Sequence, residues 1–366
     1  MRGSRKPSGA GGGGALSWRR AIVHPAVQAL LVAWTGFAAL SASDRFGPSL
    51  FAEGWPLSLT MVFGSLVAGS TSEGGGAVAF PVMTLLFGLP PGLARDFSLL
   101  VQSVGMLAAA WTIVRTRIPV ETRALLWSSL GGALGVGAGL VLLSSRVSPP
   151  AVKLFFVSLW LAFGGVLWWS RRHRERAPHL RIHDPGPRAV LLLLGAGFLG
   201  GCVSGLTGSG LDIVTFSLLT LGFGVCEKVA TPTSVVLMGG NALVGVLWRV
   251  SLAERVLGPV DALAWDYWYC CVPVVVVGAP LGALLVARRS RDFVVRLLLC
   301  SIVAQFVGAL LIVPQTAAHW LLVLATVGLG GLFFALVARY GPSGAGSRCC
   351  EGEAGEEASP RRKGEA

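Results

Sequence analysis

The sequence has little charge for its length. Of its 366 residues 13% are charged and 53% are hydrophobic, whereas about a quarter of a soluble protein is charged. The chain also lacks a Walker A sequence, a Gly-x-Ser-x-Gly nucleophile motif and a His-Glu-x-x-His motif. These absences exclude a soluble domain and a nucleotide-driven pump, and they leave an intramembrane enzyme as the least favoured alternative.

Cysteine and basic residues are present, but not in patterns that indicate a site. The seven Cys are odd in number and lie mostly inside apolar runs, unlike a disulfide framework or a zinc site. The net charge of +12 is spread over short segments between apolar runs, which is typical of membrane proteins rather than of nucleic-acid-binding domains. We expect no metal, no cofactor and no nucleic-acid partner.

Long apolar runs make up most of the chain. A helix needs about 20 apolar residues to cross the hydrocarbon core of a bilayer, and these runs are apolar on all sides, as in lipid-embedded helices. The sequence therefore predicts an all-α polytopic membrane protein with about eight transmembrane helices. They are expected over 21–43, 98–114, 124–143, 151–169, 232–248, 267–287, 294–313 and 319–338.

The chain contains an internal repeat. When the sequence is aligned with itself at one constant offset, Thr71 aligns with Thr207 and Phe80 with Phe216 without gaps. A slightly larger offset continues the match and aligns Arg146 with Arg289. We expect two repeats, 57–169 and 189–313, joined by a basic cytosolic linker over 170–188. The other segments are a basic, glycine-rich N-terminus (1–20), a first helix (21–43), a last helix (319–338) and a tail expected to be disordered (339–366).

Each repeat begins with an apolar run that is broken in its middle. The breaks are GSTSEGGGAVAF (69–80) and GLTGSGLDIVTF (205–216), where glycine and neighbouring hydroxyls weaken a helix. Irregular backbone at membrane depth is tolerated only where protein or a cavity surrounds it. We predict two re-entrant hairpins, the first with arms over 57–69 and 76–88, whose polar tips form a transporter's binding site. Close packing of helices through glycine is the alternative.

The distribution of Lys and Arg sets the orientation. With the N-terminus in the cytosol, the basic residues fall mostly in cytosolic segments, as the positive-inside rule expects. Both termini are then cytosolic, the hairpins enter from opposite sides, and the repeats are related by inversion, which supports alternating access. The basic residues on the opposite side are Arg45, Arg95, Arg146, Lys153, Arg249 and Arg255.

Two acids lie at membrane depth, Glu73 in the first tip and Asp212 in the second. An acid at the bilayer centre costs about 2.5–3.5 kcal/mol, so we interpret both as candidate proton-coupling residues. The alternative for each is that it caps a broken helix or lies at a wet hairpin tip.

The tips also combine hydroxyls with glycine-rich helix starts. Helix N-termini carry partial positive charge and unpaired N–H groups, which bind anions. No basic residue lies at that depth, which favours a small anion of low charge. Interhelical hydrogen bonding is the alternative for the polar residues that follow the tips. The candidate substrate-binding residues are Ser70, Thr71, Ser72, Gly74, Gly75, Gly76, Ser98, Gln102, Thr207, Gly208, Ser209, Gly210, Ser234 and Asn241.

At these residues the sequence resembles the sulfite exporter TauE/SafE family, also called the four-toluene-sulfonate uptake permease group. The resemblance covers about 57–338 and rests on Gly74–Gly76, Pro81, Gly88–Pro91 and Ala94–Ser98. It implies transport of organosulfonates, sulfite or other small anions.

These observations predict a secondary transporter of a small anion, either sulfur-containing (sulfite, thiosulfate or an organosulfonate) or a carboxylate. We expect alternating access around a midplane site, with coupling to protons. An anion channel is the alternative, because two inverted hairpins can also build a pore. We expect a multi-pass protein of the plasma membrane, whose partners are the anion and the lipid bilayer; a homo-oligomer is left open.

Overall fold

The computed structural model describes residues 25–42, 46–47, 49–72, 74–173, 181–182, 186–288 and 291–340. No β-strand occurs among them, which confirms the prediction of an all-α protein. Nine helices in this described part are long and apolar enough to cross a membrane, so the chain is a multi-pass integral membrane protein. The predictions for 1–20 and for the tail after Tyr340 lie outside the described residues.

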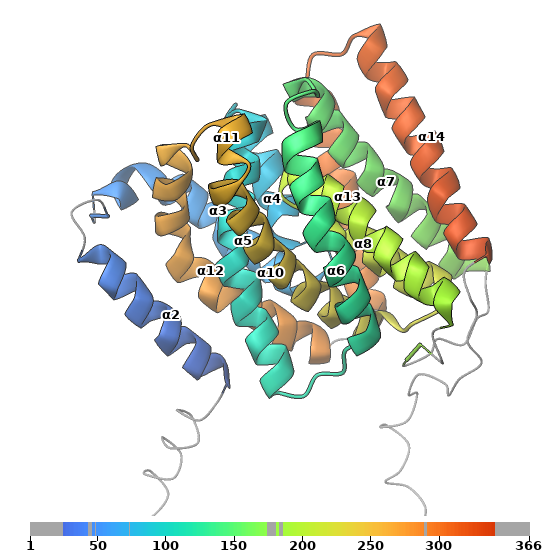
Figure 1. Cartoon of the computed structure of the whole chain (residues 1–366), viewed down its shortest axis with the longest axis horizontal. Helices are drawn as coiled ribbons and strands as arrows, with labels where there is room; N and C mark the ends of the chain where they lie inside the picture. Colours follow the sequence, from blue (N-terminus) through green and yellow to red (C-terminus); the bar gives the residue numbers. More distant parts are fainter. Residues whose placement is uncertain are drawn as a thin grey trace, which may run out of the picture.

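The helices pack into a bundle with α5 and α10 near its middle, α2 at one edge and α14 at the other (Figure 1). In the first part of the chain they are α2 (Pro25–Ser41), α3 (Leu50–Ser70), α4 (Gly74–Pro81), η1 (Val82–Leu86), α5 (Pro91–Arg115), α6 (Thr122–Ala138), η2 (Gly139–Leu143) and α7 (Pro149–His173). In the second part they are α8 (Pro187–Thr207), α9 (Leu211–Ser217), η3 (Leu218–Gly222), α10 (Glu227–Ser251), α11 (Glu254–Leu257), α12 (Ala262–Arg288), α13 (Arg291–Ile312) and α14 (Ala317–Tyr340).

The arms of the two predicted hairpins are unequal in length. The first arm, expected over 57–69, is the 21-residue helix α3, and its counterpart α8 also has 21 residues. Both are among the helices long enough to cross a membrane, so the first arm is longer than the predicted 57–69 and begins at Leu50. The helix α3 runs through Pro56, a residue that more often ends or kinks a helix. The returning arms, α4 with η1 and α9 with η3, are short.

The same turn is built twice, at equivalent positions of the two repeats. The π-helices η1 and η3 have five residues each, and after them Gly88 and Gly224 have φ angles of +65° and +67°. The N–H of Phe87 donates to the Val82 carbonyl oxygen at 3.1 Å, and the N–H of Phe223 donates to that of Leu218 at 2.9 Å. Each turn then leads into a 25-residue helix, α5 or α10, which places these two long helices equivalently after the tips.

Two closely packed helix pairs bring the parts of the chain together. Glycines repeat every four residues on α6 and on α8, and each faces backbone of the partner helix; Gly135, for example, lies against Phe198, and Gly201 lies against Gly132. The helices α3 and α12 meet in the same way, with Gly69 against the backbone of Ala279. Small residues let helix backbones approach closely in membranes. These glycines pack the helices closely, and they include Gly69 and Gly205 of the two breaks.

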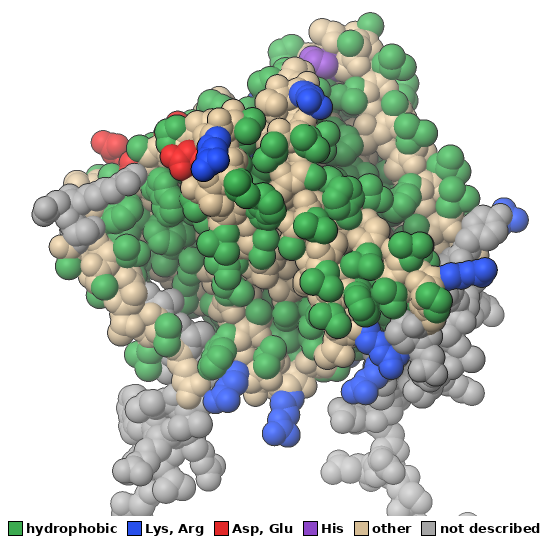
Figure 2. All heavy atoms as spheres, viewed as in Figure 1, with side chains coloured by type: hydrophobic (Ala, Val, Ile, Leu, Met, Phe, Trp, Pro, Cys, Tyr) green, Lys and Arg blue, Asp and Glu red, His purple; other side chains and the backbone are tan. Residues whose placement is uncertain are grey.

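The surface has the polarity of a membrane protein. Large apolar side chains are exposed on many helices, among them Val32 on α2 at 73%, Leu191 on α8 at 71% and Leu311 on α13 at 81%. In Figure 2 apolar side chains cover the middle of the visible face, and basic side chains gather along one edge. That edge is where α5 ends and α6 begins in Figure 1. The tips lie inside the bundle, where their described side chains are buried.

Candidate functional site

The first tip is the short turn between α3 and α4. The side chains of Ser70, Thr71 and Ser72 are all buried there. Ser70 and Thr71 donate their hydroxyls back to the carbonyl oxygen of Val67, at 3.1 and 3.0 Å, whereas the buried hydroxyl of Ser72 has no partner. Glu73, the acid predicted for this tip, lies outside the described residues. Ser72 is therefore the hydroxyl of this tip that is available to a ligand.

Three glycines start α4. Gly74 has a φ angle of +70°, which glycine adopts without strain. A Cβ atom on Gly76 would lie 2.5 Å from Nε2 of Gln102 and 2.9 Å from Cβ of Ser209, so only glycine fits against these neighbours. Because the first N–H groups of a helix have no partner within it, the start of α4 offers hydrogen-bond donors to this space.

The second tip is held together by its own side chains. α8 ends at Thr207 and is followed by Gly208, whose φ angle of +86° reverses the chain. The hydroxyl of Thr207 donates to the carbonyl oxygen of Ser209 at 2.7 Å, and the hydroxyl oxygen of Ser204 accepts from the N–H of Leu211 at 3.0 Å. These bonds fix a compact turn before α9, which begins directly after Gly210.

Asp212 faces the first tip from the second. Its side chain is only 1% exposed. Oδ1 accepts a hydrogen bond from the N–H of Ile213 at 3.0 Å, and Oδ2 accepts one from the Ser209 hydroxyl at 3.1 Å. Oδ2 also lies 2.6 Å from the position that a Cβ atom on Gly74 would occupy. The carboxylate of the second tip is therefore next to the first residue of α4.

Gln102 on α5 connects the two tips. Its Nε2 donates to the carbonyl oxygen of Gly208 at 2.8 Å and to that of Ser98 at 2.9 Å. Both amide hydrogens are thus used, and the orientation of the amide is fixed. Its Oε1 is buried without a partner and lies 2.8 Å from the Cβ position of Gly74. One side chain therefore holds the second tip and presents a bare acceptor to the first.

Ser98 and Ser234 occupy equivalent places on α5 and α10 but have different surroundings. Each donates its hydroxyl within its own helix, Ser98 to Ala94 at 2.7 Å and Ser234 to Ala230 at 3.0 Å. Ser98 also touches the second tip, because a Cβ atom on Gly208 would lie 2.5 Å from its own Cβ. The structure brings Ser98 to the site and shows no such contact for Ser234 in the described residues.

A small cavity lies beside Gly75. Its volume is about 10 Å³, roughly that of one water molecule. Gln102 and Ser65 line it, and the Ser65 hydroxyl is buried without a partner. Ser65 was not among the predicted residues, because a lone serine inside an apolar helix gives no signal in the sequence.

The second tip has a side chain where the first has this cavity. Leu211, the counterpart of Gly75 in the second repeat, lies 3.0 Å from the Cβ position of Gly132 on α6. The amide oxygen of Asn241 is also 3.0 Å from that position, and neither polar atom of this amide has a partner. Asn241 therefore lies with Leu211 against α6. The cavity of the site belongs to the first tip.

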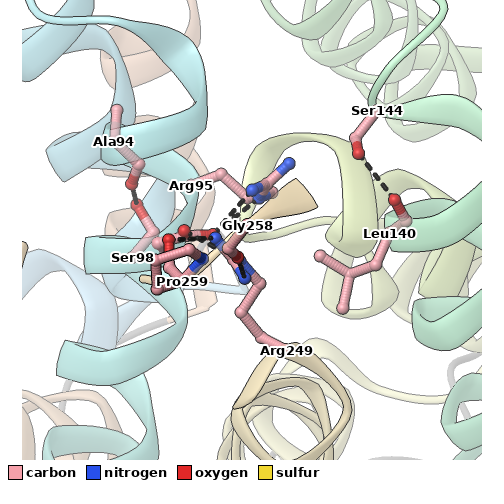
Figure 3. A network of polar contacts seen from close by, with 9 residues as sticks. Ala94, Arg95, Ser98, Leu140, Ser144, Arg249, Gly258 and Pro259 are labelled. Atoms are coloured by element: carbon pink, nitrogen blue, oxygen red, sulfur yellow. Dashed lines mark hydrogen bonds and ion pairs between the residues drawn. The ribbon is translucent and has the colours of Figure 1, made fainter. Parts of the chain in front are cut away.

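A buried ion-pair cluster lies next to the second tip. Asp96 on α5 bonds to Arg95 at 2.8 Å and to Nε of Arg249 on α10 at 2.9 Å. Arg249 also donates to the carbonyl oxygens of Gly258 and Pro259, at 2.8 and 3.2 Å. Figure 3 shows Arg249 extending from its helix toward Gly258 and Pro259, with Arg95 nearby. The cluster ties α5 to α10 and to the segment before α12.

This cluster was not anticipated from the sequence, which placed Arg95 and Arg249 on the outer side of the membrane. They are only 5% and 4% exposed, and the carbonyl oxygen of Arg95 lies 2.8 Å from the Cβ position of Gly208. One feature of the sequence could have indicated this cluster: Arg95 and Asp96 precede the candidate residue Ser98 by less than one helical turn. Among the described residues no cluster of three or more His, Cys, Asp or Glu could hold a metal ion.

A family model matches the part of the chain that contains this site. The model for sulfite exporter TauE/SafE matches residues 57–300, which is more than half of the chain and includes both tips, the ion-pair cluster and the long helices between them. No curated protein and no solved structure matches the chain. The matched residues include the glycine-rich break and the Ala94–Ser98 segment on which the sequence resemblance rests. The chain belongs to the sulfite exporter TauE/SafE family.

Proposed function

We propose that this protein is a secondary transporter that carries a small anion, sulfur-containing or a carboxylate, through a site between its two tips. Membership of a transporter family supports this proposal. The observation that carries it is the meeting of both tips at Gln102, where the start of α4 and the carboxylate of Asp212 face one another. In transporters built from two halves, substrates bind at such broken helices.

The first tip supplies the groups that an anion needs. The start of α4 offers N–H donors with partial positive charge, and Ser72 adds a buried hydroxyl that has no other partner. Gly75 leaves open space on the same side, next to Ser65. We infer that the anion lies on the first tip and is closed in by the second.

Alternating access is proposed because the two tips belong to different pairs of packed helices. The first tip belongs to α3, which packs on α12, and the second belongs to α8, which packs on α6. Separation of these two pairs would open the space between the tips. The cavity beside Gly75 is only about the size of one water molecule, so binding of an anion at the first tip requires the surrounding helices to move. A carrier is therefore favoured over an open channel.

Proton coupling is proposed from the position of Asp212. A bound anion near this carboxylate would repel it, since like charges in a low-dielectric site disfavour one another. A proton bound in the site with the anion removes that repulsion. Asp212 is the proposed proton-coupling residue, whose carboxylate accepts a hydrogen bond from this proton, and Glu73 in the first tip is the second candidate.

The test is uptake into proteoliposomes of labelled sulfite, thiosulfate, a sulfonate and a carboxylate, with and without an inward proton gradient. We expect saturable uptake of at least one of them that the gradient accelerates. In Asp212→Asn or Glu73→Gln the acceleration should disappear, whereas Asp261→Asn, which changes an exposed loop acid, should retain it. Large currents that do not saturate would support the channel, and an unchanged gradient response in both tip variants would remove the acids from the mechanism.

A further inference from the structure

We propose that the site selects an oxyanion that still carries a hydroxyl proton, such as hydrogen sulfite, over anions of similar shape that carry none. The inference rests on the proposed function and narrows its substrate class. It comes from the arrangement of acceptors at the start of α4, which a bare anion cannot satisfy.

Three oxygen atoms converge at Gly74. Oδ2 of Asp212, Oε1 of Gln102 and Oγ of Ser209 lie 2.6, 2.8 and 3.3 Å from one point, the position of a Cβ atom on Gly74. The Ser209 hydroxyl donates to Oδ2 of Asp212. Oε1 of Gln102 on α5 and Oδ2 of Asp212 in the second tip form an acceptor wall opposite the first tip.

The side-chain amide of Gln102 is held in one orientation, so its acceptor Oε1 stays directed at the first tip. Nε2 bonds to the carbonyl oxygens of Gly208 and Ser98, so exchange of the amide nitrogen and oxygen would set Oε1 against both of those oxygens. The residue is 1% exposed and Oε1 has no partner. A buried acceptor without a donor carries its full desolvation penalty. A ligand that brings a donor to this atom therefore gains binding free energy from it.

An oxyanion with one hydroxyl fits both sides of the site. Its bare oxygens accept from the N–H groups at the start of α4 and from the hydroxyl of Ser72. Its own hydroxyl donates to Oε1 of Gln102 or to Oδ2 of Asp212. An anion without a hydroxyl would set oxygen against oxygen on the acceptor wall. Sites built to pair with a substrate hydroxyl reject analogues that lack it.

The charged groups around the site limit what a pH profile alone can show. On α9 there is Asp212; on α5 there are Arg95 and Asp96; on α10 there is Arg249, which is paired with Asp96. Glu73 belongs to the first tip and lies outside the described residues. Several groups could therefore change the rate with pH. The comparison has to be made between substrates that differ in whether they can hold a proton.

The first experiment uses the full-length chain in proteoliposomes at equal pH inside and outside. Labelled sulfite, methanesulfonate and sulfate are compared at each pH across the range in which hydrogen sulfite loses its proton. We expect sulfite uptake to follow the hydrogen sulfite fraction, and the other two anions to be slower by about 10-fold or more, given the cost of an unpaired buried acceptor. Methanesulfonate uptake should show no matching dependence.

Two variants then test the acceptor wall itself. Asp212→Asn replaces an acceptor by an amide that can donate, and Gln102→Leu removes the bare acceptor, so in each the ratio of sulfite to methanesulfonate uptake should fall about 10-fold. This ratio is measured on the same vesicles and does not depend on the amount of folded protein. Asp261→Asn and Gln305→Leu change an exposed loop acid and a glutamine on α13, and both should keep the wild-type ratio.

Equal wild-type rates for sulfite, methanesulfonate and sulfate would overturn the inference and leave the proposed transporter intact. A ratio that stays at the wild-type value in both Asp212→Asn and Gln102→Leu would also overturn it. Absence of flux for every sulfur anion and carboxylate would overturn the proposed function, and the inference with it.

Discussion

Gln102 donates a hydrogen bond to the carbonyl oxygen of Gly208 at 2.8 Å, across 106 residues of sequence. Through this bond a helix of the first half of the chain holds the tip of the second half. The contact is close because Gly208 has no side chain, which lets Ser98 and Arg95 reach its backbone. The shape of the second tip is thus set by its tertiary neighbours as well as by its own turn.

Replacement of Gly208 by alanine is predicted to damage both folding and transport. Its φ angle of +86° disfavours any other residue, by about 1–2 kcal/mol. In addition, a Cβ atom would lie 2.5 Å from Cβ of Ser98 and 2.8 Å from the carbonyl oxygen of Arg95, which adds about 1–3 kcal/mol for overpacking. We expect Gly208→Ala to lower the unfolding temperature in detergent and to reduce anion uptake.

Gly88→Ala is the matched control for this change. Gly88 has a φ angle of +65°, but no atom lies within 4 Å of its Cβ position. An alanine there should therefore lose stability only through the unfavourable backbone conformation, without overpacking. The difference between the two variants measures the close approach of α5 to the second tip. Equal losses of stability in both would mean that the contacts of Gly208 with Ser98 and Arg95 contribute nothing.

Two glycines of the packed helices α6 and α8, one at their interface and one exposed, should give effects of opposite sign. A Cβ atom on Gly135 of α6 would overlap the carbonyl oxygen of Phe198 on α8, whereas one on Gly195 of α8 would meet nothing within 4 Å. We expect Gly135→Ala to destabilise the protein by about 1–3 kcal/mol. Gly195→Ala should stabilise it by up to about 1 kcal/mol, because alanine favours the helix.

The unfolding temperatures of purified Gly135→Ala and Gly195→Ala in the same detergent measure this difference. A Gly135→Ala variant as stable as the wild type would show that α6 and α8 can separate without cost. The movement of these two helices could then no longer be assumed to be concerted.

Much of the architecture could be predicted because it depends on local rules. Apolar runs of spanning length predicted seven of the nine long helices in the described part of the chain. The repeat was found from matches such as Thr71 with Thr207 and Phe80 with Phe216, and both copies turn at a glycine with a positive φ angle, Gly88 and Gly224. The start of α3 could not be placed, since the helix continues through Pro56 against the usual effect of proline.

The site could be predicted only in part. Glycines, hydroxyls and an acid in a broken apolar run indicated the two tips, and the structure places Gly74, Gln102, Ser209 and Asp212 together. Sequence position did not show that Asn241 turns toward α6, because side-chain direction on a buried helix depends on its neighbours. Ser65 and Asp96 were missed for the same reason, since their importance arises from contacts between distant segments.

Loss of Arg249 is predicted to be costly because three bonds depend on it. Its guanidinium bonds to Asp96 at 2.9 Å and to the carbonyl oxygens of Gly258 and Pro259 at 2.8 and 3.2 Å. Breaking a buried ion pair by removing one partner costs about 3–5 kcal/mol. We expect Arg249→Gln to lower the unfolding temperature strongly. Arg255→Gln, on the exposed α11, should change stability by about 0.5 kcal/mol or less.

A double-mutant cycle separates the ion pair from the other contacts of Arg249. When Asp96→Asn is combined with Arg249→Gln, the loss should be smaller than the sum of the two single losses, because each removes the same contact. Arg249→Lys should be intermediate, since a single ammonium cannot replace a guanidinium that bonds to three separate oxygen atoms. Strict additivity would contradict a direct coupling between α5 and α10. The cluster would then hold only the segment before α12, and the two helices that follow the tips would be free to move independently at this end.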